Sequence, residues 1–261
     1  MAINKTDVRN IEDVRLYLKE QAKKSKRLYH YTTYESLLAI LFSNTFRLSR
    51  MDLLNDKAEK KLGINDERMQ NYSISFTQEK EYVSMWAMYG KPSGIKIRLD
   101  FDRSLLVNDK TQLYFDGERK NRIYYSKPLF EIKSTADRTV LSDVVYFDKE
   151  NGILKHNTKP FPNLSFDSSQ TSQLTGLIKY DAWEFEKETR INVKLDKEQI
   201  EDYPEYIFIG FDNELVSSFK ITFNPWMSNF MKEEIKKSLN SLTGIELKYS
   251  NSTNDGEIGE F

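Results

Sequence analysis

The chain of 261 residues contains no cysteine and two histidines, His30 and His156. Without cysteine there can be no disulfide, no thiolate metal site and no cysteine nucleophile, and the composition suits a reducing cytoplasm. No apolar run approaches the roughly 18 residues that a membrane-spanning helix needs, and the charged N-terminus is unlike a signal peptide. We therefore expect a cytoplasmic protein with no membrane partner.

An excess of one charge is also missing. Lysine and arginine number 39 against 40 aspartates and glutamates, so net charge does not indicate a nucleic-acid or membrane partner. Neither phosphate-binding glycine motif occurs, G-x-x-x-x-G-K-[ST] or G-x-G-x-x-G, which excludes the usual phosphate cradles. The hydrophobic fraction of 39% is sufficient for a sizeable core.

Hydrophobic periodicity predicts many short strands and a few helices. Helices are expected over 8–25 with Asp7 as cap, 34–44 with Thr32 or Thr33 as cap, 81–90 and 226–244. Strands are expected over 28–32, 45–51, 71–77, 94–101, 122–126, 140–147, 183–195, 205–211, 217–224 and 245–250. This pattern indicates an α+β domain with a mostly antiparallel sheet system.

The predicted organisation has three parts. A basic helix covers 1–27, the main domain covers 28–250, and a flexible acidic tail covers 251–261. The polar segment 148–173 is long for a loop without structure, so we expect it to be a lid or a mobile binding element.

The main chemical pattern is D-A-W-E-F-E-K-E-T-R-I-N at 181–192. On a strand, Glu184, Glu186, Glu188 and Arg190 would share one face, because successive side chains alternate. The row of carboxylates fits an exposed face whose repulsion Arg190 and nearby lysines relieve. It equally fits a cleft in which one carboxylate stabilises a developing cation or activates a hydroxyl, since clustered acids raise each other's pKa.

Several motifs together resemble the histidine-type ADP-ribosyltransferases. L-Y-H-Y-T-T followed by I-L-F-S-N-T-F-R-L-S resembles their opening strand L-W-H-G-[ST], helix and second strand. S-I-S-F-T followed by M-W-A-M-Y resembles the element whose serine and aromatic residue hold nicotinamide, and E-F-E-K-E resembles their E-x-E strand. The resemblance implies a split antiparallel β-sandwich with flanking helices, NAD as substrate in the cleft between the sheets, and no metal.

Over about residues 28–250 the chain also resembles DUF2971, a bacterial family of unknown function. The marks are L-N-D-x-x-E, S-F-[ST] with M-W-x-x-Y, and [YF]-E-K-E-x-R. In the first of these, Asn55, Asp56 and Glu59 fit a structural turn with a helix cap as well as a functional motif.

The ADP-ribosyltransferase resemblance also implies roles for single residues. Glu188 would be the catalytic carboxylate, which stabilises positive charge on the ribose as nicotinamide leaves. Glu186 would orient it or the acceptor. The residues expected to hold NAD are His30, which also counts as catalytic, and Tyr31, Thr32, Ser75, Trp86 and Tyr89.

Some of these assignments stay open. Trp86 is the first choice for stacking on nicotinamide and Tyr89 the second, and each fits core packing equally well. Tyr31 replaces a glycine of the transferases, and it either crowds the ligand or stacks on it. His156 matches no motif and is expected at the surface.

The predicted function is NAD-dependent ADP-ribosyl transfer by a bacterial defence or toxin effector, with an antitoxin protein as a possible partner. A nucleic-acid acceptor, RNA or a single-stranded DNA base, is favoured by the aromatic fraction of 13% and by cations close to the His30 strand: Lys24, Lys26, Arg27, Arg47 and Arg50. Lys24, Lys26 and Arg27 follow the predicted N-terminal helix, and a solvated helix end is the more usual explanation of such a charge run. The alternatives are protein ADP-ribosylation, NAD hydrolysis, and a non-catalytic module that binds NAD or nucleic acid in a defence complex.

Overall fold

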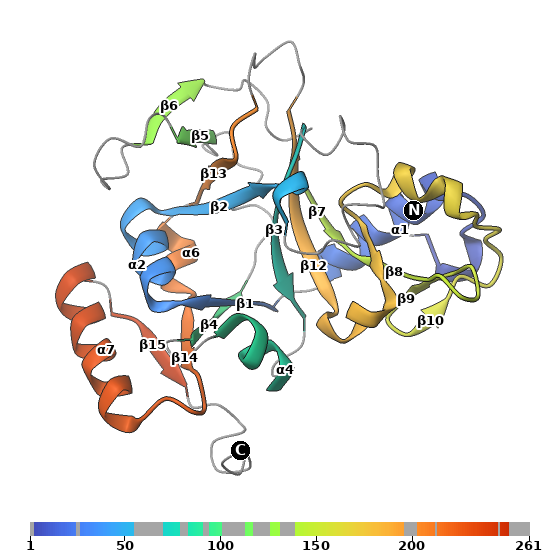
Figure 1. Cartoon of the computed structure of the whole chain (residues 1–261). Helices are drawn as coiled ribbons and strands as arrows, with labels where there is room; N and C mark the ends of the chain where they lie inside the picture. Colours follow the sequence, from blue (N-terminus) through green and yellow to red (C-terminus); the bar gives the residue numbers. More distant parts are fainter. Residues whose placement is uncertain are drawn as a thin grey trace.

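The computed structural model describes residues 3–24, 27–54, 70–78, 83–90, 94–100, 113–116, 126–130, 139–195, 203–211, 213–244 and 246–250. Within these ranges the chain is a mixture of helices and strands arranged in one large and one small β-sheet (Figure 1). The predicted α+β class is confirmed. Asn55, Asp56, Glu59, Lys26 and the 251–261 tail lie outside the described residues, as does the side chain of Lys24.

The large sheet has 11 strands in the order β15-β14-β4-β1-β3-β2-β13-β5-β6, with β12 paired to β3 and β7 paired to β12. Its strands are β1 (Arg27–Thr33), β2 (Thr45–Arg50), β3 (Asn71–Thr77), β4 (Gly94–Asp100), β5 (Leu113–Asp116), β6 (Ser126–Phe130), β7 (Thr139–Asp143), β12 (Glu188–Lys194), β13 (Tyr206–Gly210), β14 (Lys220–Phe223) and β15 (Lys248–Ser250). The small sheet has the order β10-β9-β8-β11, from β8 (Val145–Asp148), β9 (Ile153–His156), β10 (Lys159–Pro160) and β11 (Ile178–Tyr180). The described strand pairs are antiparallel except β8 with β11 and β14 with β15.

The helices lie beside these sheets (Figure 1). The α-helices are α1 (Ile11–Lys24), α2 (Tyr34–Ser43), α4 (Val83–Met85), α6 (Asn213–Ser217) and α7 (Asn229–Thr243), and a π-helical turn η4 (Trp86–Gly90) continues α4. Helix α1 lies next to the small sheet, and α2 and α7 lie at the large one (Figure 1). Short 3₁₀ turns are η1 (Lys5–Asp7), η2 (Met51–Leu53), η5 (Ser168–Leu174) and η6 (Asp181–Glu186). In the described part of the chain, no helix combines the length and the apolar character needed to cross a membrane.

Two predicted helix starts can be compared with the structure. Thr33 caps α2, because its hydroxyl accepts the Ser36 backbone N–H at 3.3 Å. Asp7 does not cap α1. Asn10 does, since its side chain accepts the Asp13 N–H at 3.0 Å while Asp13 accepts the Asn10 N–H at 3.3 Å, a reciprocal box.

A second hydrophobic core lies apart from the main one and includes the N-terminal helix. Val14 and Leu18 of α1 are fully buried in one hydrophobic cluster with Val145 of the small sheet. Leu154 and Phe161 from the segment 148–173 are buried in the same cluster. The expected lid is therefore wrong: 148–173 carries β9, β10 and part of η5, because its scattered apolar residues pack on α1.

The large sheet splits at β3. Its neighbour β12 pairs along the whole of β3, from Thr77 to Asn71. On the other edge, β1 pairs with β3 only at Thr77, whereas β2 pairs at Ser73 and Tyr72. In Figure 1, β2 accordingly lies at the upper part of β3 and β1 near its lower end. The middle of β3 therefore borders an opening between two strands, and this opening positions the site.

Two predicted strands are broken in the structure. The segment 140–147 divides at Val144 into β7 and β8, which belong to different sheets. The segment 183–195 begins as the 3₁₀ turn η6, and Lys187 then adopts a left-handed conformation with φ 40° before β12 starts at Glu188. Glu184, Glu186 and Glu188 therefore do not alternate along one strand, and the expected row of three carboxylates is not formed.

Candidate active site

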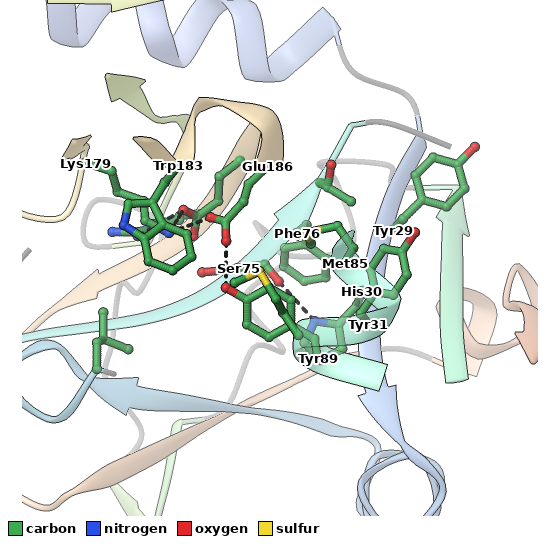
Figure 2. Close-up of a pocket in the computed structure, with 15 residues that line it drawn as sticks. Tyr29, His30, Tyr31, Ser75, Phe76, Met85, Tyr89, Lys179, Trp183 and Glu186 are labelled. Carbon is green, nitrogen blue, oxygen red and sulfur yellow. Dashed lines mark hydrogen bonds and ion pairs between the residues drawn. The ribbon is translucent and has the colours of Figure 1, made fainter. Parts of the chain in front are cut away.

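A pocket of about 470 Å³ opens beside β3. It brings together residues from β1, β3, η4, β11, η6 and β12 (Figure 2). The lining residues are Tyr29, His30, Tyr31, Leu54, Ser75, Phe76, Thr77, Met85, Met88, Tyr89, Lys179, Trp183, Glu186, Glu188 and Arg190. Of the predicted catalytic and cofactor-binding residues, His30, Tyr31, Ser75, Tyr89, Glu186 and Glu188 are among them.

His30 is held in one tautomer and one orientation. Its Nδ1 lies 3.0 Å from the carbonyl oxygen of Ser75, and a carbonyl can only accept, so Nδ1 carries the proton. Phe46 and Phe76 lie against the ring, with centroids 6.4 and 5.5 Å away. Burial lowers the pKa of His30 by more than the bond to Ser75 raises it. At neutral pH the ring is therefore uncharged, and Nε2 is a hydrogen-bond acceptor.

Glu188 is a buried carboxylate with strong cationic partners. Arg190 donates from Nε to Oε1 at 2.7 Å and from Nη2 to Oε2 at 3.0 Å, and Lys179 Nζ lies 3.2 Å from Oε2. The Ser75 hydroxyl also donates to this carboxylate. Burial alone would raise the pKa of Glu188, but Arg190 and Lys179 outweigh it and lower the pKa to about 2.

Burial and neighbouring charges also act on the pKa of Glu186, but with the opposite net effect. Its Oε2 is 2.5 Å from Lys179 Nζ, and its Oε1 accepts the Tyr89 hydroxyl at 2.6 Å (Figure 2). Burial and the neighbouring charge of Glu188 raise the pKa of Glu186 despite these bonds. The pocket thus holds two carboxylates whose pKa values are displaced in opposite directions.

The chain bend at Lys187 places the two carboxylates together. The Lys187 N–H bonds back to the Glu184 carbonyl at 3.2 Å and ends η6. Glu188 is then fixed through its backbone, because its N–H donates to the Tyr146 hydroxyl at 2.9 Å and its carbonyl accepts the Val144 N–H at 2.9 Å. The break between β7 and β8 therefore supports the position of Glu188.

Glu184 is turned away from this pair. Its carboxylate accepts the backbone N–H of Thr158 at 2.6 Å, and it is not among the residues that line the pocket.

The predicted aromatic residues occupy different positions. Trp86 is fully buried, meets Tyr31 edge to face at a centroid distance of 4.8 Å, and does not line the pocket. The first choice for nicotinamide stacking thus lies in the core, whereas Tyr89, the second choice, lies in the pocket and is 39% exposed. Thr32 is buried and is not a lining residue either.

The described cations that were expected to bind the acceptor lie outside the pocket lining. Arg47 is exposed on β2, with its guanidinium 4.6 Å from the Tyr206 ring centroid. Arg50 is paired with Asp52 at 2.7 Å and bonds the Tyr203 carbonyl. Arg27 is exposed at the start of β1.

Several residues that line or support the site were not predicted from the sequence. Lys179 and Trp183 line the pocket, and Tyr146 supports Glu188. No motif marks Lys179 or Tyr146, because the small sheet brings them to the site, whereas Trp183 lies within the 181–192 pattern, where η6 replaces the expected strand. The proximity of Lys179 and Tyr146 depends on the parallel pairing of β11 with β8.

His156, expected at the surface, is in fact 3% exposed. Its Nε2 lies 3.1 Å from Asp143 Oδ2, and its Nδ1 lies 3.4 Å from the Tyr17 hydroxyl. Asp143 also accepts from Thr189 at 2.8 Å. A buried polar cluster thus connects α1, β7, β9 and β12.

Metal binding has no candidate group in the described ranges, where no three His, Asp or Glu side chains lie close enough together to hold an ion.

Residues 85–191 match DUF2971. This family, described as a protein of unknown function, thus matches a stretch that includes η4, Lys179 and both pocket glutamates. A search of curated proteins finds no match.

Two solved structures of DarT from Thermus sp. 2.9 resemble the fold weakly. The complex with NAD⁺ matches with a TM-score of 0.37 and 9% identity, covering 88% of this chain and 97% of the other. The complex with carba-NAD⁺ matches with a TM-score of 0.37 and 11% identity, covering 89% and 97%.

Proposed function

We propose that this chain is an NAD-dependent ADP-ribosyltransferase. The observation that carries the proposal is the meeting of His30 and Glu188 in one pocket, on either side of Ser75. The Ser75 carbonyl accepts from His30, and its hydroxyl donates to Glu188, so one residue of β3 connects both groups that the sequence motifs predict.

The pocket residues fit a dinucleotide substrate. Its volume of about 470 Å³ is within the range of small-molecule sites, and it combines a few fixed polar groups with aromatic and thioether surfaces. His30 Nε2 would accept a ribose hydroxyl, and Tyr89 or Tyr31 would pack against the nicotinamide ring. NAD supplies a ribose carbon that becomes electrophilic as nicotinamide leaves.

The two carboxylates suit different parts of the transfer. Glu188, with a pKa of about 2, is ionised at neutral pH, and its fixed negative charge would stabilise the positive charge that develops on the ribose. Glu186 has a raised pKa and contacts the Tyr89 hydroxyl, so it is the better base for the proton of an incoming nucleophile.

The proposed acceptor is a nucleic acid. The exposed Arg27 and Arg47 support this choice, since phosphate contacts position a polynucleotide without reading its sequence. A bacterial defence or toxin role would follow from modification of a nucleic acid that is essential to a host or phage.

The deciding experiment incubates the protein with labelled NAD and separate pools of single-stranded RNA, single-stranded DNA, duplexes and cell protein. Label in a nucleic-acid pool, absent with Glu188→Gln, is the expected result. Label in protein alone would move the acceptor to protein, and free ADP-ribose alone would indicate NAD hydrolysis. Binding of NAD without any product would leave a non-catalytic module.

A further inference from the structure

Lys179 is a buried lysine placed between the two pocket glutamates. Its side chain is 7% exposed, and Nζ lies 2.5 Å from Glu186 Oε2 and 3.2 Å from Glu188 Oε2. The Trp183 ring covers the ammonium group at 5.0 Å from its centroid. Lysine is seldom buried in proteins unless it is paired, and here both partners are pocket glutamates.

The other cation of the pocket serves Glu188. Arg190 makes the two-bond contact with the Glu188 carboxylate, and its Nη1 donates to the Gly176 carbonyl at 3.2 Å. Among the hydrogen bonds described for Glu186, the partners are Lys179 and the neutral hydroxyl of Tyr89. Lys179 thus contacts both acids.

We propose that Lys179 is a positioning residue that keeps Glu186 ionised and holds the two carboxylates at a fixed separation. Two neighbouring buried carboxylates repel each other, and without a cation between them one takes up a proton. A protonated Glu186 could not accept a proton from a nucleophile. The catalytic consequence of the proposal rests on the proposed function, but its electrostatic part does not.

The charged and titratable groups that face Glu186 come from four elements. Glu188 and Arg190 belong to β12, Tyr89 to η4 and Tyr146 to β8, while Lys179 comes from β11. Burial raises the pKa of both tyrosines, so at neutral pH both are uncharged and neither adds a charge beside Glu186. Removing that charge leaves Glu186 beside Glu188.

The direct test is a titration of the carboxyl carbons of Glu186 and Glu188 by ¹³C NMR. In Lys179→Met the midpoint of Glu186 should rise by about 1 to 3 pH units, the usual effect of an opposite charge at this distance. In Lys179→Arg, which keeps the charge, it should stay near the wild-type value. An unchanged midpoint in folded Lys179→Met would overturn the proposal.

Lys155→Met is the matched control. Lys155 lies in the same small sheet and is paired with Asp148 at 2.8 Å and Asp181 at 3.6 Å, but it does not line the pocket. Its loss should leave both glutamate midpoints unchanged. A shift of the same size as in Lys179→Met would mean that the small sheet, and not the contact of Lys179, sets the pKa values.

If Lys179→Met does not fold, the contact can be tested by an NMR titration of the wild-type protein. The Nζ signal of Lys179 should move with the same midpoint as Glu186. Two unrelated midpoints would contradict the proposed contact.

Turnover of NAD gives the functional test. Lys179→Met should lose activity at pH 7 and regain much of it at higher pH, where Glu186 ionises, whereas damage to the fold would not be reversed by pH. Activity equal to wild type at all pH values would overturn the positioning role. If the wild type itself neither binds nor consumes NAD, the proposed function fails, while the titration still decides on Lys179.

Discussion

At the scale of single residues, Ser75 joins the two sides of the pocket. Its carbonyl orients His30 and its hydroxyl contacts Glu188, so the neutral imidazole and the ionised carboxylate keep fixed positions before a substrate arrives. Groups that are oriented in advance need little reorganisation during the reaction, which is the main source of electrostatic catalysis.

Glu188→Gln removes a charge and keeps the shape of the side chain. We expect transfer to fall by about 10²- to 10³-fold, the usual effect of losing one such electrostatic contact. Glu184→Gln is the control, since Glu184 contacts the Thr158 N–H and lies outside the pocket lining. Initial rates of nicotinamide release measure both variants. Equal activity of Glu188→Gln and wild type would remove Glu188 from the mechanism.

The acid side of the pH profile should belong to Glu186. Glu188 stays ionised down to a pH of about 2, whereas the pKa of Glu186 is raised above its usual value, so Glu186 is the first of the two to take up a proton as the pH falls. The rate should therefore fall on the acid side at a pH above 4.5, the reference value for glutamate. In Glu186→Gln the remaining activity should lose this dependence. If the acidic fall of the rate is unchanged in Glu186→Gln, another group causes it.

At the scale of elements, the bend at Lys187 decides how the glutamates meet. The alternation of W-E-F-E-K-E matches a strand, and the sequence predicts a strand through it. Phe185 instead packs on the cluster of Tyr31, Met85 and Trp86, and Glu186 reaches Lys179. The contacts of Phe185 join distant parts of the chain, and the contact of Glu186 with Lys179 depends on the tertiary placement of β11. Tertiary contacts of this kind override the local strand pattern.

The difference between local patterns and tertiary contacts also explains which parts of the site could be predicted. His30 on its strand, the Thr33 cap and the strand of Ser75 follow from local patterns, and the structure has them. Glu186 and Glu188 line the pocket as expected, but through a bend and not through a strand face. Lys179 and the buried His156 depend on how the small sheet packs, which periodicity does not reveal.

Substitutions at Lys187 test the bend. Its φ of 40° lies in the left-handed region, which glycine adopts at no steric cost and β-branched residues adopt poorly. Both Lys187→Gly and Lys187→Val remove the lysine side chain, so their difference isolates the backbone. We expect Lys187→Val to be less stable than Lys187→Gly by about 1 to 2 kcal/mol in urea unfolding. Equal stability would mean that Lys187 does not need the left-handed conformation.

The polar cluster around His156 should connect the N-terminal helix to the strand of Glu188. His156→Ala leaves the buried Asp143 without its histidine partner, and we expect a loss of several kcal/mol of unfolding free energy. Tyr17→Phe removes one hydrogen bond and should cost about 1 kcal/mol. Urea unfolding followed by circular dichroism measures both. If His156→Ala is no less stable than Tyr17→Phe, the cluster does not hold these elements together.

At the scale of the whole molecule, the pocket depends on two sheets with separate cores. The large sheet supplies His30, Ser75 and Glu188, and the small sheet, packed on α1, supplies Lys179. The N-terminal helix therefore contributes to the site through packing, in addition to any role of its basic end. Under the proposed function, the acceptor would bind the exposed surface outside the pocket.

Reversing the charge of Arg27 and Arg47 tests a nucleic-acid acceptor. Both are exposed and neither lines the pocket, whereas Arg50 is paired with Asp52 and its reversal would also disturb the fold. Arg27→Glu with Arg47→Glu should weaken transfer to nucleic acid and leave the affinity for NAD unchanged. Transfer by the wild type should also fall steeply with added salt, because each phosphate contact releases counterions. The fall of log activity with log salt concentration should be shallower in the double variant, by the amount that about one to two phosphate contacts contribute. Measuring transfer and NAD affinity from low to moderate salt separates these effects. An identical salt slope in both proteins would show that these arginines do not hold the acceptor.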